Sequence, residues 1–81
     1  MPPEFVFVDT SGWFASLMPS DPDHVAAQAW LKANSKPLFT TDYILDETLT
    51  LLRARGQFSR AKAFGESMLE GELAALHFLT E

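Results

Sequence analysis

The chain is short, acidic and rich in apolar residues, with 81 residues, a net charge of −5 and 47% hydrophobic residues. A chain of this length is expected to form one small domain with a single core, over residues 1–81. The negative charge excludes a broadly basic nucleic-acid surface, so any RNA contact is expected to be local. The absence of cysteine excludes disulfides and thiolate metal sites and suits a reducing compartment.

No signal for export or for membrane insertion is visible in the sequence. The apolar runs are far shorter than the roughly 20 residues that a membrane-spanning helix needs. The N-terminal run Met-Pro-Pro-Glu lacks the basic and apolar regions of a signal peptide. We therefore expect a cytoplasmic protein that does not bind membranes.

Apolar periodicity, helix caps and chain breakers predict strands that alternate with helices. Strands are expected at about residues 5–8, 37–40 and 73–79, and helices at about residues 11–17, 22–34, 43–55 and 59–70. The expected helix caps are Ser11, Asp21 and Asp42, and the expected helix stops are Pro19, Gly56 and Gly71. This alternation is typical of an α/β fold, here a three-layer α/β/α arrangement around a parallel sheet of about three strands.

The first strand leads into the most informative segment. Residues 5–8 read Phe-Val-Phe-Val, an apolar run typical of a parallel strand covered on both faces, and Asp9-Thr10-Ser11 follows. In such sheets the reactive groups collect beyond the carboxyl ends of the strands. A carboxylate near a core needs a partner, which can be a cation, backbone N–H groups or a metal. Asp9 is therefore a candidate site residue, or the cap of the helix that follows it.

A second acid is expected to reach the same edge of the sheet. At 100° per residue, the helix over residues 43–55 carries a broad apolar stripe that faces the core. Glu47 lies on the margin of this stripe, on the flank of Leu51, whereas Asp46 points nearly opposite the stripe. We expect Glu47 to meet a group at a strand end and Asp46 to be solvated.

These residues occur in an order that resembles a known family. The apolar strand with Asp9-Thr10-Ser11, a short aromatic helix, and the run over residues 40–52 with Thr41 and Glu47 resemble the first half of a PIN domain of the VapC toxin type. Residues 76–81 are similar to the third strand of that family and the start of the helix after it. The resemblance implies metal-dependent RNA cleavage with Mg²⁺ or Mn²⁺, by a toxin that pairs with an antitoxin-like protein.

The resemblance also implies a role for each matching residue. Asp9 would bind the metal directly, and Glu47 would complete the site or hold a metal-bound water. Thr10, Ser11 and Thr41 would orient these ligands through hydrogen bonds. The chemistry is consistent, because hard divalent cations prefer carboxylate oxygens and a bound metal lowers the pKa of its water. We expect Asp9 and Glu47 to approach one metal or bridging water.

The acids of the family pattern are only partly present. Members of the family gather three or four carboxylates, whereas this sequence offers two good matches before it stops at Glu81. The other acids are explained as helix starts, a solvated helix face or a terminal residue: Asp21, Asp23, Glu66, Glu70 and Glu81. We therefore expect a truncated PIN domain that binds Mg²⁺ weakly and has little ribonuclease activity at modest Mg²⁺.

The remaining polar and aromatic residues are mostly interpreted as structural. Four basic residues form either a solvated helix end, which is favoured, or an RNA-backbone patch: Arg53, Arg55, Arg60 and Lys62. The isolated His24 and His77 are expected to be structural. The three aromatic residues that could stack on bases are expected in the core: Trp13, Phe14 and Trp30.

Three functions remain open from the sequence. The chain is a PIN-type ribonuclease, a catalytically inactive PIN remnant that acts as a protein-interaction or dimerisation module, or an unrelated α/β domain in which Asp9 only caps a helix. In a truncated PIN fold, residues 5–8 would form a sheet edge, and an apolar edge without charge favours pairing with another chain. We therefore expect a homo-oligomer, or a complex with a dedicated partner, rather than a free monomer.

Overall fold

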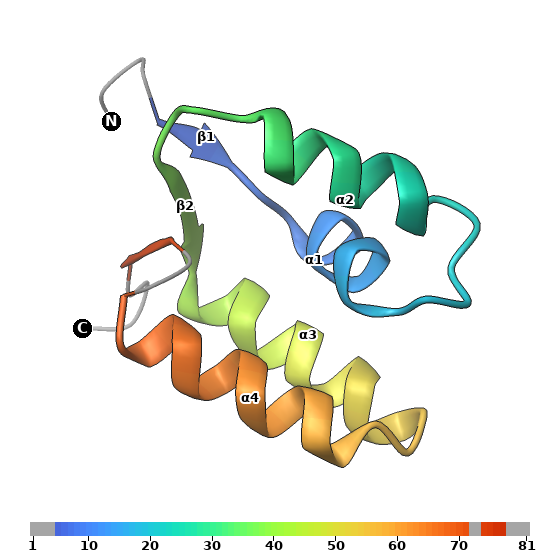
Figure 1. Cartoon of the computed structure of the whole chain (residues 1–81). Helices are drawn as coiled ribbons and strands as arrows, with labels where there is room; N and C mark the ends of the chain where they lie inside the picture. Colours follow the sequence, from blue (N-terminus) through green and yellow to red (C-terminus); the bar gives the residue numbers. More distant parts are fainter. Residues whose placement is uncertain (1–4, 72–73, 78–81) are drawn as a thin grey trace.

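The computed structural model describes residues 5–71 and 74–77, and within these residues three strands alternate with four helices (Figure 1). The strands are β1 (Val6–Phe7), β2 (Leu38–Thr41) and β3 (Ala75–His77). The helices are α1 (Thr10–Leu17), α2 (His24–Ala33), α3 (Asp42–Ala54) and α4 (Phe58–Leu69). All strand pairs are parallel, and the strand order is β1-β2-β3. The predicted α/β fold with a parallel sheet is confirmed.

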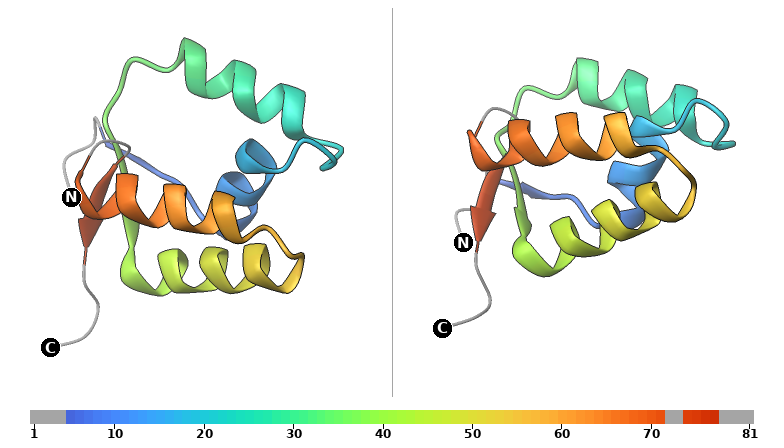
Figure 2. Two further views of the ribbon diagram at one scale, coloured as in Figure 1. Left: turned by 60° about the horizontal axis from the view of Figure 1, so that its bottom comes forward. Right: turned by 90° about the horizontal axis from the view of Figure 1, so that it is seen from below.

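The helices pack mainly against one another in pairs. Helix α1 packs against α2, and α3 packs against α4, while α1 also contacts α3. Both views in Figure 2 show α3 and α4 running side by side. None of the described helices, of which the 13-residue α3 is the longest, combines the length and the apolar character that crossing a bilayer requires.

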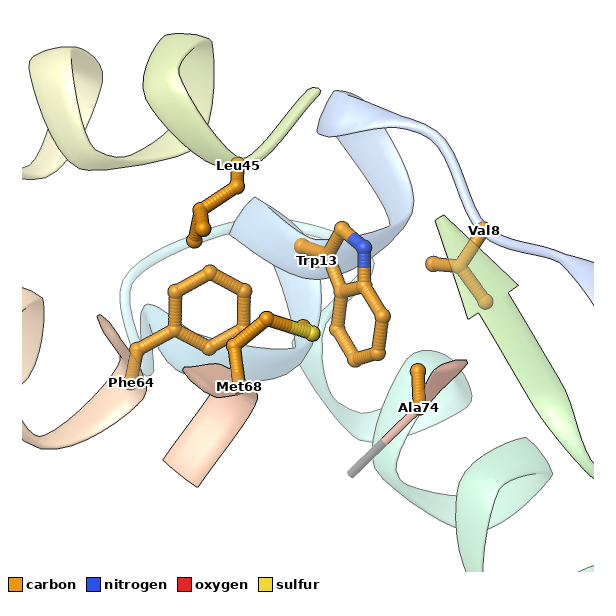
Figure 3. Close-up of a cluster of buried hydrophobic side chains, with 6 residues drawn as sticks. All are labelled: Val8, Trp13, Leu45, Phe64, Met68 and Ala74. Carbon is orange, nitrogen blue, oxygen red and sulfur yellow. The ribbon is translucent and has the colours of Figure 1, made fainter. Parts of the chain in front are cut away.

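The core consists of two clusters of buried side chains. The first joins β1, α1, α3, α4 and the start of β3, as Figure 3 shows for Val8, Trp13, Leu45, Phe64, Met68 and Ala74. The second lies between α1, α3 and α4 and contains Met18, Leu52 and Ala61. The predicted burial of Trp13 is confirmed, but Trp30 is 46% exposed, so its predicted place in the core is wrong.

Helix α2 begins later than the sequence predicts. The predicted cap, Asp21, accepts a hydrogen bond from the Asp23 N–H at 2.8 Å and so closes a turn before the helix. Pro22 therefore lies in this turn and is not the first helical residue, and α2 begins at His24. A carboxylate that accepts a hydrogen bond from the backbone N–H two residues further along the chain forms a turn there instead of capping a helix.

The ends of α3 and α4 follow the prediction. Gly56 and Gly71 adopt positive φ angles of 72° and 77°, which glycine reaches without the strain that a Cβ atom causes. Strand β3 covers Ala75–His77 of the predicted strand over residues 73–79, of which Leu73, Phe78 and Leu79 lie outside the described residues.

Strand β1 is bonded on one side only. The N–H groups of Val6 and Val8 donate to the carbonyls of Pro37 and Phe39 at 2.9 and 3.0 Å, and so face β2. Because backbone groups alternate along a strand, the N–H and C=O of Phe7 point away from β2. In the part of the chain that the structure describes, no strand lies beyond β1, as predicted. Phe7 is 47% exposed, so the prediction that β1 is covered on both faces is wrong.

Candidate active site

The carboxyl ends of β1 and β2 lead directly into α1 and α3. Asp9 follows β1 as the N-cap of α1, and Thr41 ends β2 as the N-cap of α3. Because β1 and β2 are parallel neighbours, both helices start at the same edge of the sheet. Polar side chains from two distant parts of the sequence therefore meet at this edge.

The Asp9 carboxylate is held by local hydrogen bonds. Its Oδ1 accepts from the Gly12 N–H and from the Ser11 hydroxyl, each at 3.0 Å. Asp9 has extended backbone and caps α1, so the prediction that Ser11 caps this helix is wrong. Ser11 contacts the carboxylate instead, and the Asp9 side chain remains exposed at the surface.

Two replacements of Asp9 separate its capping role from its charge. Asp9→Ala is expected to lower the free energy of unfolding by about 1 kcal/mol, because the Gly12 N–H loses its acceptor. Asp9→Asn retains an acceptor oxygen, and its free energy of unfolding is expected to stay within about 0.5 kcal/mol of the parent value. Urea denaturation measures both differences. Equal losses in the two variants would show that the charge, rather than the capping bond, supports the helix start.

Glu47 is connected to the start of α1 through Thr10. The Thr10 hydroxyl donates a hydrogen bond to Glu47 Oε1 and so joins α1 to α3. Asp46 and Glu47 are both exposed, but at Asp46 the recorded bond uses the backbone carbonyl, which accepts from the Thr50 hydroxyl. Thr10 is thus bonded to one candidate acid and adjacent in sequence to the other.

Two threonines of β2 support this edge in different ways. The Thr41 hydroxyl accepts the Ile44 N–H at 3.2 Å, so Thr41 caps α3, and the predicted cap Asp42 is the first helical residue. Thr40 is completely buried and donates to the Val8 carbonyl at 3.0 Å, which fixes the end of β1 against β2. The role of Thr40 was not predicted from the sequence. Its signal was a hydroxyl within a buried strand, which must find an acceptor.

The candidate residues line different surface depressions. Asp9 lines a depression of about 360 Å³ with residues of β1 and α2. Thr10 and Ser11 line a larger one of about 750 Å³, next to Phe14. Glu47 lines a third, of about 530 Å³, on the surface of α3. Thr10 connects the two carboxylates although they line different depressions, because it is bonded to Glu47 and follows Asp9 in the sequence.

The oxygen ligands at this edge of the sheet suit a hard divalent cation, but they are few. Carboxylate and hydroxyl oxygens are suitable ligands for Mg²⁺ and Mn²⁺. Within residues 5–71 and 74–77, no group of three or more Asp, Glu, His or Cys side chains is arranged to hold a metal. A cation held by Asp9 and Glu47 alone would take its remaining ligands from water. Glu81 lies outside the described residues.

The four basic residues are partly engaged within the fold. The guanidinium carbon of Arg55 lies 5.2 Å from the centroid of the Phe14 ring, in cation–π contact. The Arg60 side chain donates to the Leu17 carbonyl at 3.3 Å. All four residues are exposed, and these intramolecular contacts engage two of them, Arg55 and Arg60. Contact of the four with RNA stays a prediction.

The predicted structural role of His24 is confirmed. Its Nδ1 lies 2.8 Å from the Ala15 carbonyl, and the Gln28 amide donates to the Ser16 carbonyl close by. These two contacts join α2 to the C-terminal half of α1. His77 ends β3, and its side chain is not among those that the structure describes.

The fold is that of a PIN domain of the VapC type. The chain is similar to the crystal structure of the Mycobacterium tuberculosis toxin VapC20, described as cleaving the sarcin–ricin loop, with 28% sequence identity and a TM-score of 0.82. The similarity covers 93% of this chain and 57% of the chain of VapC20. No protein-family model matches the sequence, and no curated protein sequence matches it significantly. The idea of an unrelated α/β domain is wrong, although Asp9 does cap a helix.

Proposed function

We propose that the chain carries the metal-binding residues of a VapC-type ribonuclease, with Asp9 and Glu47 as ligands of Mg²⁺ or Mn²⁺. The main support is the Thr10–Glu47 hydrogen bond beside Asp9, in a fold similar to a toxin that cleaves the sarcin–ricin loop. By that similarity the proposed substrate is a structured RNA loop. The proposed protein partner is an antitoxin-like protein.

Each side chain has a separate task in this proposal. The Ser11 hydroxyl and the Gly12 N–H hold Oδ1 of Asp9, so we assign Oδ2 to the metal. Thr10 holds Oε1 of Glu47 and fixes this side chain relative to α1. The bound metal would supply an activated water and stabilise charge on the phosphate.

A Mn²⁺ titration followed by NMR tests the metal assignment. Paramagnetic broadening is expected first at the backbone amides next to Asp9 and Glu47. Asp9→Asn and Glu47→Gln keep the observed hydrogen bonds but remove a charge, and each is expected to weaken Mn²⁺ binding at least about tenfold. Asp46→Asn removes a neighbouring exposed charge and is the matched control. Unchanged broadening in Asp9→Asn would contradict the assignment.

RNA cleavage is measured separately with an end-labelled hairpin of the sarcin–ricin loop. At Mg²⁺ on the order of 1 mM, little or no cleavage is expected, because two carboxylates hold the metal weakly. At roughly tenfold higher Mg²⁺ or Mn²⁺, cleavage is expected to rise in the parent and to be absent in Asp9→Asn. Robust cleavage at the lower concentration would show a more complete metal site than Asp9 and Glu47 provide.

A non-catalytic role is the second candidate. It is favoured by the exposed aromatic side chains of Phe7 and Trp30, which line one surface depression beside Asp9. In this case the chain would bind a protein partner, and metal-dependent cleavage would be absent at every Mn²⁺ concentration. The hairpin assay therefore separates the two candidates.

A further inference from the structure

Two surface depressions meet along one side of α3. The depression of about 530 Å³ that contains Glu47 is also lined by Tyr43, and the depression of about 750 Å³ is lined by Arg55. Leu51 lines both of them. Residues four positions apart are neighbours on a helix surface, so these four exposed residues form one row along α3 and its C-cap, which we call the α3 row: Tyr43, Glu47, Leu51 and Arg55.

The candidate metal site lies beside this row. The Thr10 hydroxyl donates to Glu47, and Thr10 also lines the depression that contains Arg55. Helix α1, which begins at Thr10, lies between α2 and α3 (Figure 1). A substrate whose reacting phosphate lies at Asp9 and Glu47 would therefore extend along α3 in two directions, toward Tyr43 and toward Arg55.

The Arg55 guanidinium is held in place at one end of the α3 row. Its central carbon lies 5.2 Å from the centroid of the Phe14 ring. Stacking of this kind uses the face of the guanidinium, and the N–H groups at its edge keep the fork geometry that matches two oxygens of a phosphate. Asp21 and Asp23 line the same depression and repel a phosphate, so the phosphate contact is expected at Arg55.

The other three basic residues of this region are less suited to the same contact. Arg53 and Lys62 do not line the depression that Arg55 lines. Arg60 also lies outside it and donates to the Leu17 carbonyl at 3.3 Å. The structure therefore distinguishes Arg55 from three residues of the same charge that lie close to it in the sequence.

Tyr43, at the opposite end of the α3 row, suits a base rather than a phosphate. Its side chain is 62% exposed and lies one helical turn from Glu47, in the same depression. The carboxylates of Asp46 and Glu47 line this depression and repel phosphate. An aromatic ring binds an unstacked base through its face, and this contact needs no positive charge.

We propose that the α3 row binds a single-stranded loop of the RNA substrate, with one base stacked on Tyr43 and one backbone phosphate bound by Arg55. At 1.5 Å per residue the row is about 18 Å long, so it spans more than one nucleotide. A loop fits this surface better than a duplex, because its bases can turn outward onto a ring. The inference rests on the proposed function, since it takes Asp9 and Glu47 as the place where the RNA reacts.

Binding of the labelled sarcin–ricin hairpin, followed by fluorescence anisotropy at Mg²⁺ on the order of 1 mM, tests the Arg55 contact. Arg55→Gln is expected to raise the dissociation constant at least about fivefold. It is also expected to reduce the slope of log Kd against log salt concentration by about 0.7, the share of one phosphate contact with a single strand. A purely structural role of Arg55 would leave this slope unchanged. Arg53→Gln removes the same charge from an exposed position outside the depression and is the matched control.

The same assay tests the stacking of a base on Tyr43. Tyr43→Ala is expected to raise the dissociation constant at least about fivefold, because the base loses its stacking surface. Tyr43→Phe keeps the ring and is expected to bind within about twofold of the parent chain. Phe58→Ala is the control, since it removes a ring that is 65% exposed on α4 and lies outside both depressions.

Three results overturn the inference: equal weakening by Arg55→Gln and Arg53→Gln, unchanged binding in Tyr43→Ala, or a parent chain that binds the hairpin no more tightly than about 100 μM. Mn²⁺ broadening at Asp9 and Glu47 is measured on the same variants and is expected to be unchanged. Any of the three results with normal broadening contradicts the role of the α3 row alone. A parent chain without broadening contradicts the proposed function itself.

Discussion

Trp13→Ala is expected to lower the free energy of unfolding by about 3 to 5 kcal/mol, the usual cost of removing a large aromatic side chain from a core. A domain of this length has a total stability of about 4 to 12 kcal/mol, so the change removes a large part of it. Trp13 is central because its ring contacts Phe64 at a centroid distance of 5.3 Å and shares a cluster with Val8 and Met68.

The second tryptophan provides the matched control. Trp30→Ala removes the same atoms from a half-exposed position of α2 and is expected to cost less than about 1 kcal/mol in the monomer. Urea denaturation followed by far-UV circular dichroism, at concentrations low enough to avoid association, measures both changes. Similar losses in the two variants would contradict the assignment of Trp13 to the core and of Trp30 to the surface.

Leu52→Ala is expected to lower the free energy of unfolding by about 2 to 5 kcal/mol. Leu52 is completely buried in one cluster with Met18, which follows α1, and Ala61 of α4. Its removal leaves a cavity that this small domain has little means to fill. The same denaturation measurement gives the loss.

The adjacent residue serves as the control for this cavity. Leu51 lies one position along α3 and is 36% exposed, so Leu51→Ala is expected to cost less than about 1 kcal/mol. The broad apolar stripe that the sequence predicts for this helix includes Leu51, on the flank next to Glu47. Equal losses at Leu51 and Leu52 would show that the stripe is buried more evenly than the structure indicates.

The alternation of strands and helices could be predicted from the sequence because its signals are local. Two of these signals are the glycines that follow α3 and α4 and the apolar periodicity within these two helices. Both are read from residues that lie close together in the sequence. The exposure of Trp30 could not be predicted in this way. It depends on whether another segment packs over α2, and the periodicity of α2 shows an apolar face without showing what covers it.

The candidate site was predicted in part. The pattern predicts Asp9 at a strand end and Glu47 in contact with a group at a strand end, and the structure bonds Glu47 to Thr10, the residue after Asp9. The shared metal of Asp9 and Glu47 stays a prediction. The sequence could not decide which hydroxyl or acid caps each helix. Several capping residues lie within one turn of each start, and small differences in backbone angle determine whether Asp9 or Ser11 accepts the free N–H.

Helix α2 is attached to the rest of the fold mainly through α1. Its recorded side-chain bonds to the rest of the fold are the contacts of His24 and Gln28 with two carbonyls of α1, and none of its residues is buried. Detaching α2 breaks these contacts and uncovers residues of α1, but neither core cluster contains a residue of α2. We therefore expect the local opening of α2 to cost less free energy than global unfolding and to leave both core clusters folded.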